Sequence, residues 1–161
     1  RRAMRDMVQR ECVREVPAED VHTLALLLVD VDHFKRINDR HGHESGDDAL
    51  LLIAQTLQDG LREGDQVARW GGEEFLVMLP ATGGDEAVKV AERLRQRVAA
   101  QRFMGAAGRQ PLSVTLGVAV RLPHESIDRT LARADQALYM GKESGRNRVV
   151  LAPEPEITTQ N

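Results

Sequence analysis

The sequence predicts an α/β sandwich, and three observations indicate it. Apolar residues recur at helical spacing, most clearly in the stripe that runs from Ala49 to Leu61. Between such stripes lie apolar runs typical of buried strands, beginning with residues 24–29. A glycine pair, Gly71-Gly72, joins two extended segments and predicts a hairpin in the middle of the chain. A hairpin between two strand-helix-strand crossover units is typical of helices packed on a central sheet.

The expected elements follow from these periodicities in chain order. A helix is expected over residues 1–16, ended by Pro17. After it come a strand within 23–34, a short and a longer helix within 34–61 joined by glycine, strands at 67–70 and 73–79, a helix at 87–98, a loop at 103–111, a strand at 112–120, a helix from 127 to the glycines at 141 and 145, and a strand at 148–152. Residues 1–152 are expected to form one domain, and the polar tail 153–161 is expected to be disordered.

Composition and charge exclude several classes of protein. The 161 residues carry a formal net charge of −3, whereas a nucleic-acid groove requires a basic excess, so no nucleic-acid partner is expected. Cys12 is the single cysteine, which excludes an internal disulfide framework and a cysteine-rich zinc site. No apolar run could cross a bilayer and no signal peptide precedes the first run, so we expect a cytoplasmic domain without a membrane partner. Because the chain begins at Arg1 without Met, we expect it to be a piece of a longer protein.

Two acidic pairs occur where the first strand and the hairpin turn end. Asp30 and Asp32 lie at the strand edge where open α/β sheets bind ligands, and Glu73 and Glu74 follow the glycine turn. Because side chains alternate along a strand, we expect the members of each pair to point to opposite faces and one from each pair to converge. Two close carboxylates repel unless a cation lies between them, and hard oxygen ligands select Mg²⁺ or Mn²⁺. Spacing alone is equally compatible with four solvated loop carboxylates.

The glycine pair is a further indication of a binding site. Adjacent glycines allow positive φ at both central positions of a type I′ turn. They also leave bare backbone against which a large flat ligand can lie. A hairpin needs no acids at its tip, so glutamates beside both glycines favour a site over a simple turn.

Longer motifs resemble those of one known family. They are "VDVDHFKRINDRHGHESGD" at 29–47, "ARWGGEEF" at 68–75, "TLGVA" at 115–119 and "ADQALYMGKESGRNRV" at 134–149. Their content and order resemble the GGDEF family, the diguanylate cyclases, in the variant with Glu at the third signature position. The resemblance implies a central, mostly antiparallel sheet flanked by helices, related to the palm domain of nucleotide cyclases and polymerases. It also implies the condensation of two GTP molecules into cyclic di-guanylate and pyrophosphate.

The resemblance assigns roles to the acidic residues. Asp30 and Glu73 would be the catalytic pair and would hold Mg²⁺ or Mn²⁺, with the carbonyl of Val31 as a further ligand and Glu74 nearby. Such ions lower the pKa of the attacking 3′-hydroxyl and align the entering and leaving oxygens. Whether Glu73 or a water molecule takes the proton is open. Asp32 is expected to be a structural acid.

The resemblance also assigns the substrate contacts. Asn38 and Asp47 would read guanine, because a carboxylate accepts hydrogen bonds from guanine N1–H and its 2-amino group together. Lys142 and Arg146, four residues apart and expected on one helix face, would clamp the triphosphate. The full set of expected GTP contacts is Phe34, Lys35, Asn38, Asp47, Gly71, Gly72, Lys142 and Arg146.

A second site is implied upstream of the signature. The segment "REGD" at 62–65 is an RxxD motif at the family's inhibitory spacing, and it would bind cyclic di-guanylate. Arg62 can offer a fork to guanine O6 and N7, as arginine does in DNA readout, and Asp65 can accept from the opposite edge. Arg93 matches the arginine that a partner domain contributes. These residues predict product inhibition.

The implied reaction also predicts partners. Each domain would hold one GTP, so two domains must face each other with two-fold symmetry, set by an upstream sensor or dimerisation segment. An alternative is a catalytically silent domain that binds cyclic di-guanylate or GTP as a regulatory module. A second alternative is a polymerase-like or adenylyl-type cyclase, which Asn38, Asp47 and the RxxD motif disfavour.

Overall fold

The computed structural model describes residues 2–3, 6 and 23–155. Most of the helix expected over 1–16 and most of the tail expected over 153–161 therefore lie outside the described residues. The elements are β1 (Leu24–Val31), α2 (Phe34–Asp59), β2 (Gln66–Arg69), β3 (Glu74–Pro80), α3 (Gly84–Ala99), β4 (Arg102–Gly105), β5 (Gly108–Pro111), β6 (Val114–Val120), α4 (Ile127–Glu143) and β7 (Val149–Leu151).

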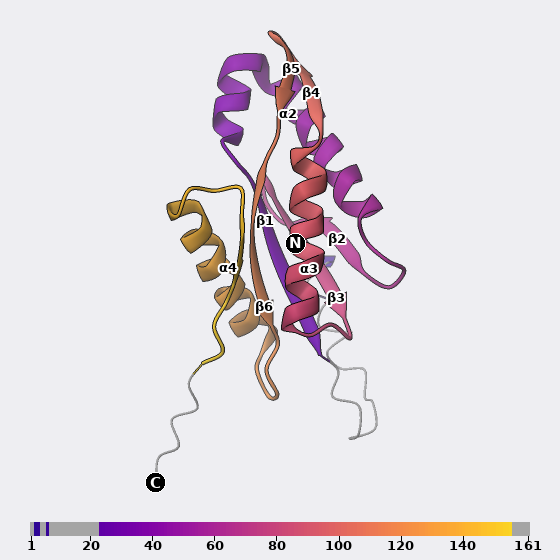
Figure 1. The fold of residues 1–161 in the computed structure, drawn as a ribbon, viewed down its shortest axis with the longest axis vertical. Helices are drawn as coiled ribbons and strands as arrows, with labels where there is room; N and C mark the ends of the chain where they lie inside the picture. The colour runs from indigo at the N-terminus through magenta and orange to yellow at the C-terminus, as the bar shows by residue number, and fades with distance from the viewer. Residues whose placement is uncertain (1, 4–5, 7–22, 156–161) are drawn as a thin grey trace.

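A mixed five-stranded sheet in the order β2-β3-β1-β6-β7 forms the centre of the domain (Figure 1). Strand β1 pairs antiparallel with β3 and β6, β2 pairs antiparallel with β3, and only β7 runs parallel to its neighbour β6. The predicted, mostly antiparallel sheet is thus confirmed. All of β1 is buried, because it has a strand on each side and helices over both faces.

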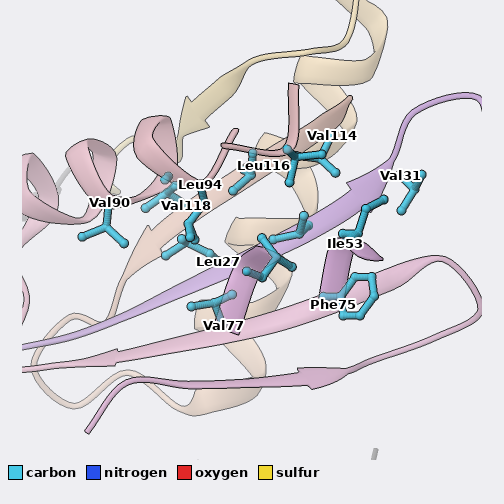
Figure 2. Packing of buried hydrophobic residues seen from close by; sticks show 14 of the residues in the cluster. Leu27, Val31, Ile53, Phe75, Val77, Val90, Leu94, Val114, Leu116 and Val118 are labelled. Atoms are coloured by element: carbon cyan, nitrogen blue, oxygen red, sulfur yellow. The ribbon is translucent and has the colours of Figure 1, made fainter. Parts of the chain in front are cut away.

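The two faces of the sheet bury separate apolar clusters. Alternate side chains of β1, beginning with Ala25 and Leu27, pack with residues of α2 and α3 such as Ile53 and Leu94 (Figure 2). The intervening side chains, such as Leu26, pack against α4 in the second cluster. The sandwich therefore has α2 and α3 on one face and α4 on the other.

Helix α2 is broken at Gly42, whose backbone lies at φ 86° and ψ 163°. Glycine adopts this conformation without the steric cost that a Cβ would add. The break confirms the short helix, glycine connection and longer helix expected over residues 34–61. It also turns the two helical segments against each other, since a Cβ added at Gly46 would collide with Asn38 Oδ1.

The loop expected over residues 103–111 was wrong. This segment forms the antiparallel hairpin β4–β5, a separate two-stranded sheet that turns at residues 106–107, and β5 begins at Gly108 with φ 93°. Only Phe103 of β4 is buried, so the segment lacks the alternating apolar pattern by which a strand is predicted from sequence. Hydrogen bonding to the partner strand, rather than an apolar pattern, defines this hairpin.

Within the described part of the chain, no helix is both long enough and apolar enough to cross a membrane.

Candidate functional site

A cavity of about 460 Å³ lies at the carboxyl end of β1, and we name it the strand-end cavity. Four parts of the chain supply its walls: the end of β1, the first two turns of α2, the β2–β3 connection, and the end of α4 with the segment that follows it. Its lining residues are Asp30, Val31, His33, Phe34, Lys35, Arg36, Asp39, Glu73, Lys142 and Arg146. Most of the residues predicted to hold metal and triphosphate therefore meet in one cavity. Sequence reasoning did not single out Arg36 and Asp39, which share the helical segment of Lys35.

Asp30 is the most buried carboxylate of this cavity, with 7% of its surface exposed. Its Oδ2 accepts a hydrogen bond from Lys142 Nζ at 2.8 Å. Burial raises the pKa of Asp30, and the charges of Glu73 and Asp32 act in the same direction, while Lys142 opposes them. The fold thus holds this carboxyl where its negative charge is unfavourable even with the Lys142 ammonium beside it.

The oxygen atoms at this edge fit a magnesium ion that shares its coordination with substrate. Among the described residues no three His, Cys, Asp or Glu side chains are grouped so as to hold a metal. Asp30 and Glu73 nevertheless line one cavity with Val31. Mg²⁺ is commonly bound through one or two carboxylates, with phosphates and water completing the octahedron. The residues present therefore fit a metal that arrives with a nucleotide better than a closed structural site.

Glu73 and Glu74 both lie beside Asp30, but the backbone brings them there differently. The β1–β3 register pairs Asp30 directly with Glu74, which places both residues on the α4 side of the sheet. Glu73 precedes β3, and its carbonyl accepts from Val31 N at 3.2 Å while its side chain lines the strand-end cavity. The assignment of separate roles to the two glutamates stays a prediction.

The expectation that Asp30 and Asp32 point to opposite faces was wrong. Residues two apart share a face, because the side-chain period of a strand is two. Asp32 lies on the α4 side, where it accepts from Ser113 Oγ at 2.7 Å, Thr115 Oγ1 at 2.6 Å and Asn147 N at 3.0 Å. These three bonds support the structural role expected for Asp32, which stays a prediction.

The glycine turn is wider than the expected two-residue type I′ turn. Residues 70–73 lie between β2 and β3, and Gly72 does not have a left-handed φ. Arg69 holds the turn instead, donating through Nη2 to the carbonyl of Gly72 at 2.6 Å and through Nε to that of Gly71 at 3.2 Å. A Cβ at Gly72 would meet nothing within 4 Å, so its backbone is open on this side.

The predicted guanine contacts, Asn38 and Asp47, lie outside the strand-end cavity. Asn38 has a buried Oδ1 without a hydrogen-bond partner. Asp47 is exposed and lines a second cavity of about 540 Å³ between α2 and β2, with Leu50 and Arg69 among its neighbours. This oxygen faces Gly46 in the second segment of α2, since a Cβ added at Gly46 would collide with it.

The two glycines of the turn and the two glutamates that follow them do not all line the strand-end cavity. The lining of the strand-end cavity includes Glu73 from this turn but not Gly71, Gly72 or Glu74. A nucleotide that contacts every predicted residue would have to extend from that cavity past the turn.

The RxxD residues meet beside the start of β2. Asp65 is buried and accepts from Arg62 N at 3.2 Å and from Arg62 Nε at 3.4 Å. Arg62 Nη2 also donates to the carbonyl of Pro80 and to Thr82 Oγ1, each at 3.0 Å. Arg93, on α3, donates to the carbonyl of Gly60 at 2.9 Å in the same connection. Sequence reasoning missed Pro80 and Thr82 because they lie at the far end of β3.

Comparison with known families identifies the motif set. The model for the diguanylate cyclase GGDEF domain matches residues 1–148 of this chain.

The chain belongs to the GGDEF family.

Curated relatives of this GGDEF domain carry diguanylate cyclase names. DgcM of Escherichia coli is 47% identical over 128 residues, which are 80% of this chain and 30% of that protein. DgcP of Pseudomonas aeruginosa is 42% identical over 154 residues, or 94% of this chain and 22% of that protein. This domain therefore spans less than a third of the length of either relative.

Solved structures share the fold of this GGDEF domain. The GGDEF domain of DgcB from Caulobacter crescentus in complex with c-di-GMP is 33% identical, with a TM-score of 0.87 over 94% of this chain and 90% of that one. SiaD from Pseudomonas aeruginosa, in complex with its activator SiaC, is 37% identical, with a TM-score of 0.88 over 94% of this chain and 58% of that one. These likenesses support the α/β architecture independently of the motifs.

Proposed function

We propose that this GGDEF domain condenses two GTP molecules into cyclic di-guanylate and pyrophosphate. The observation that carries the proposal is the strand-end cavity, which combines two carboxylates, Asp30 and Glu73, with two cations, Lys142 and Arg146. Opposed carboxylates and cations suit a metal-bound polyphosphate, since each sign of charge on the ligand meets its complement. The names of the relatives point to the same activity.

The basic and the acidic residues of the cavity would have different roles in the reaction. Lys142 and Arg146, with Lys35, would bind the phosphate chain, and Asp30, Glu73 and the Val31 carbonyl would hold Mg²⁺ or Mn²⁺. When bound, the metal lowers the pKa of the attacking 3′-hydroxyl and neutralises phosphate charge. Lys142, which bonds Asp30 at 2.8 Å, lines the same cavity and would there be able to donate to phosphate as well.

Asn38 and Asp47 support guanine over adenine in this proposal. Asp47 is exposed in its cavity and can accept from guanine N1–H and the 2-amino group. Adenine would leave that carboxylate without donors, and a site built to bond a missing group discriminates strongly. GTP, not ATP, is therefore the expected substrate.

Product inhibition through Arg62, Asp65 and Arg93 is the second part of the proposal. Arg62 keeps much of its side chain exposed at 58%, although it bonds Asp65. Cyclic di-guanylate would take the guanidinium edge of Arg62 through guanine O6 and N7. An inhibitory complex would then include Arg93 of a second domain, which requires the homodimer that the reaction itself needs.

One experiment tests the catalytic proposal. The full 161-residue chain is incubated at high concentration with GTP and Mg²⁺, and nucleotides are separated by chromatography. Cyclic di-guanylate is expected from the wild type and from the control Glu86→Gln, an exposed glutamate on α3, but not from Glu73→Gln. GTP binding without turnover would support the regulatory-module alternative, and a cyclic mononucleotide would contradict the reaction proposed.

A second experiment tests the inhibitory site in the same assay. Added cyclic di-guanylate is expected to slow the wild type and the exposed-arginine control Arg109→Ala, and to have at least tenfold less effect on Arg62→Ala. Equal inhibition of all three proteins would rule out the RxxD residues as the binding site.

A further inference from the structure

We propose that Asp32 is a positioning residue, which holds the segment 145–147 and through it keeps Arg146 at the strand-end cavity. The inference rests on the proposed function, because it treats Arg146 as a ligand of the GTP phosphates. It concerns an acid that does not line the strand-end cavity.

The contacts of Asp32 join three separate parts of the fold. Its Oδ2 accepts from Ser113 Oγ, just before β6, and from the backbone N–H of Asn147, beyond the end of α4. Its Oδ1 accepts from Thr115 Oγ1, and that hydroxyl also accepts from Asn147 N at 3.1 Å. With 6% of its surface exposed, Asp32 is bonded away from water. Bonds to a buried charged acceptor are stronger than neutral ones.

The segment that Asp32 holds has an unfavourable backbone conformation. Gly145, Arg146 and Asn147 lie at φ 119°, 63° and 45°, all in the left-handed region. A non-glycine residue remains there only when its surroundings supply compensating contacts. Arg146 N bonds the Gly141 carbonyl at 3.0 Å, so the segment is tied to α4 at one end and to Asp32 at the other.

Arg146 does not reach the cavity by helical spacing, contrary to the sequence expectation. Helix α4 ends at Glu143, so Lys142 lies in the helix and Arg146 lies in the left-handed segment beyond it. Both residues line the strand-end cavity. The location of Arg146 therefore depends on the segment, and the bond from Asn147 N fixes the next residue of that segment beside the strand that bears Asp30.

The test combines nucleotide affinity with amide hydrogen exchange in the full chain. The probe is 3′-deoxy-GTP with Mg²⁺, which lacks the attacking hydroxyl. Asp32→Asn is expected to weaken its binding about tenfold and to speed exchange of the amides in 144–148, because an amide can no longer accept from all three donors. Thr115→Val removes only the hydroxyl that bridges Asp32 and Asn147 N. It is expected to weaken 3′-deoxy-GTP binding and to speed amide exchange in 144–148, both by less than Asp32→Asn does.

A double-mutant cycle separates positioning from general destabilisation. Arg146→Ala alone is expected to weaken 3′-deoxy-GTP binding, and adding Asp32→Asn to it is expected to cause little further loss. Independent, multiplicative losses in the double variant would overturn the proposal. Unchanged exchange in 144–148 on Asp32→Asn would overturn it as well.

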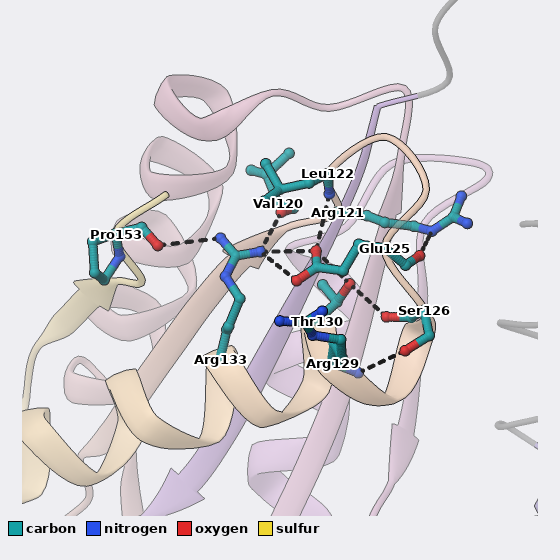
Figure 3. A network of polar contacts seen from close by, with 9 residues as sticks. All are labelled: Val120, Arg121, Leu122, Glu125, Ser126, Arg129, Thr130, Arg133 and Pro153. Atoms are coloured by element: carbon teal, nitrogen blue, oxygen red, sulfur yellow. Dashed lines mark hydrogen bonds and ion pairs between the residues drawn. The ribbon is translucent and has the colours of Figure 1, made fainter. Parts of the chain in front are cut away.

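Glu125 supplies a matched control at the other end of α4 (Figure 3). It is also a buried acid, 8% exposed, and its carboxylate accepts from Leu122 N, Thr130 Oγ1 and Arg133 Nη1. Glu125→Gln is expected to lower Tm without changing the affinity for 3′-deoxy-GTP. An equal loss of affinity in Glu125→Gln would show that any damage to α4 has this effect and would overturn the positioning role.

The outcomes also distinguish this inference from the catalytic proposal. A wild type that binds 3′-deoxy-GTP with the coupling described, yet makes no cyclic di-guanylate, would support the role of Asp32 and contradict the cyclase activity. A wild type that makes cyclic di-guanylate while Asp32→Asn keeps full affinity and normal exchange would do the reverse.

Discussion

Asp30 is a single residue whose charge costs the folded protein stability, although the proposed chemistry needs that charge to hold a metal. Burial raises the pKa of its carboxyl, and the neighbouring carboxylates Glu73 and Asp32 raise it further, against the ion pair with Lys142. The folded state therefore binds a proton at Asp30 more tightly than the unfolded state does. Its charged form lowers stability at neutral pH, and protonation relieves this as pH falls through the raised pKa.

The predicted consequence is that Asp30→Asn raises Tm in metal-free buffer at pH 7. The rise is expected because the substitution removes a buried charge that costs stability in the folded state. The advantage over the wild type should shrink as pH falls, because the wild-type carboxyl then becomes neutral too. Calorimetry across a pH series with EDTA measures this difference, and a Tm advantage that grows on acidification would contradict the prediction.

Helix α4 is the element that brings the cations to the acids, and glycine allows it to lie close to the sheet. A Cβ at Gly117 in β6 would collide with the backbone carbonyl of Ala134, and it would lie 2.5 Å from Leu138 N. Both neighbours are α4 backbone, which cannot yield as a flexible side chain would. The approach of α4 to β6, and so the reach of Lys142 to Asp30, depends on the missing side chain at Gly117.

We predict that Gly117→Ala destabilises the domain by about 1–3 kcal/mol through this overpacking. It should also weaken GTP binding, because α4 must move outward with Lys142. Gly84→Ala is the control, since a Cβ there makes only ordinary contacts, at 3.8 Å and beyond, and the residue does not have a positive φ. Denaturant unfolding of the two variants measures the difference, and equal midpoints would contradict the packing argument.

The proposed reaction requires two domains at the scale of the whole molecule. Each strand-end cavity would bind one GTP, so the bond between two nucleotides requires two cavities facing each other. The relatives named above are at least three times longer than the matched region, and what joins two catalytic domains in the whole protein is part of the proposal.

We therefore predict that specific activity rises with chain concentration at saturating GTP. The rate should follow the square of chain concentration while the dimer is a minor species, since two chains form each active unit. Chromatographic assay of cyclic di-guanylate over a hundredfold range of concentration measures this order. A strictly linear dependence at low concentration would indicate an active monomer.

Local sequence patterns predicted the kinds of elements well and the hairpin β4–β5 poorly. The apolar stripes of α3 and α4 and the buried run of β1 are strong because the core requires them at fixed periods. Segment 103–111 buries little apolar surface, so no period marks it. The glycine turn was misjudged for another reason: the side chain of Arg69 holds it open, which the turn residues themselves do not indicate.

The sequence by itself determined the order of the main helices and strands, the family and the composition of the site, because periodicity and motifs are properties of neighbouring residues. Only the tertiary structure decided which acids share a face and which cations reach them. Strand register pairs Asp30 with Glu74, and a left-handed segment beyond α4 carries Arg146. Both depend on contacts between residues far apart in the chain, as does the bond from Asn147 N to Asp32, so no local pattern could specify them.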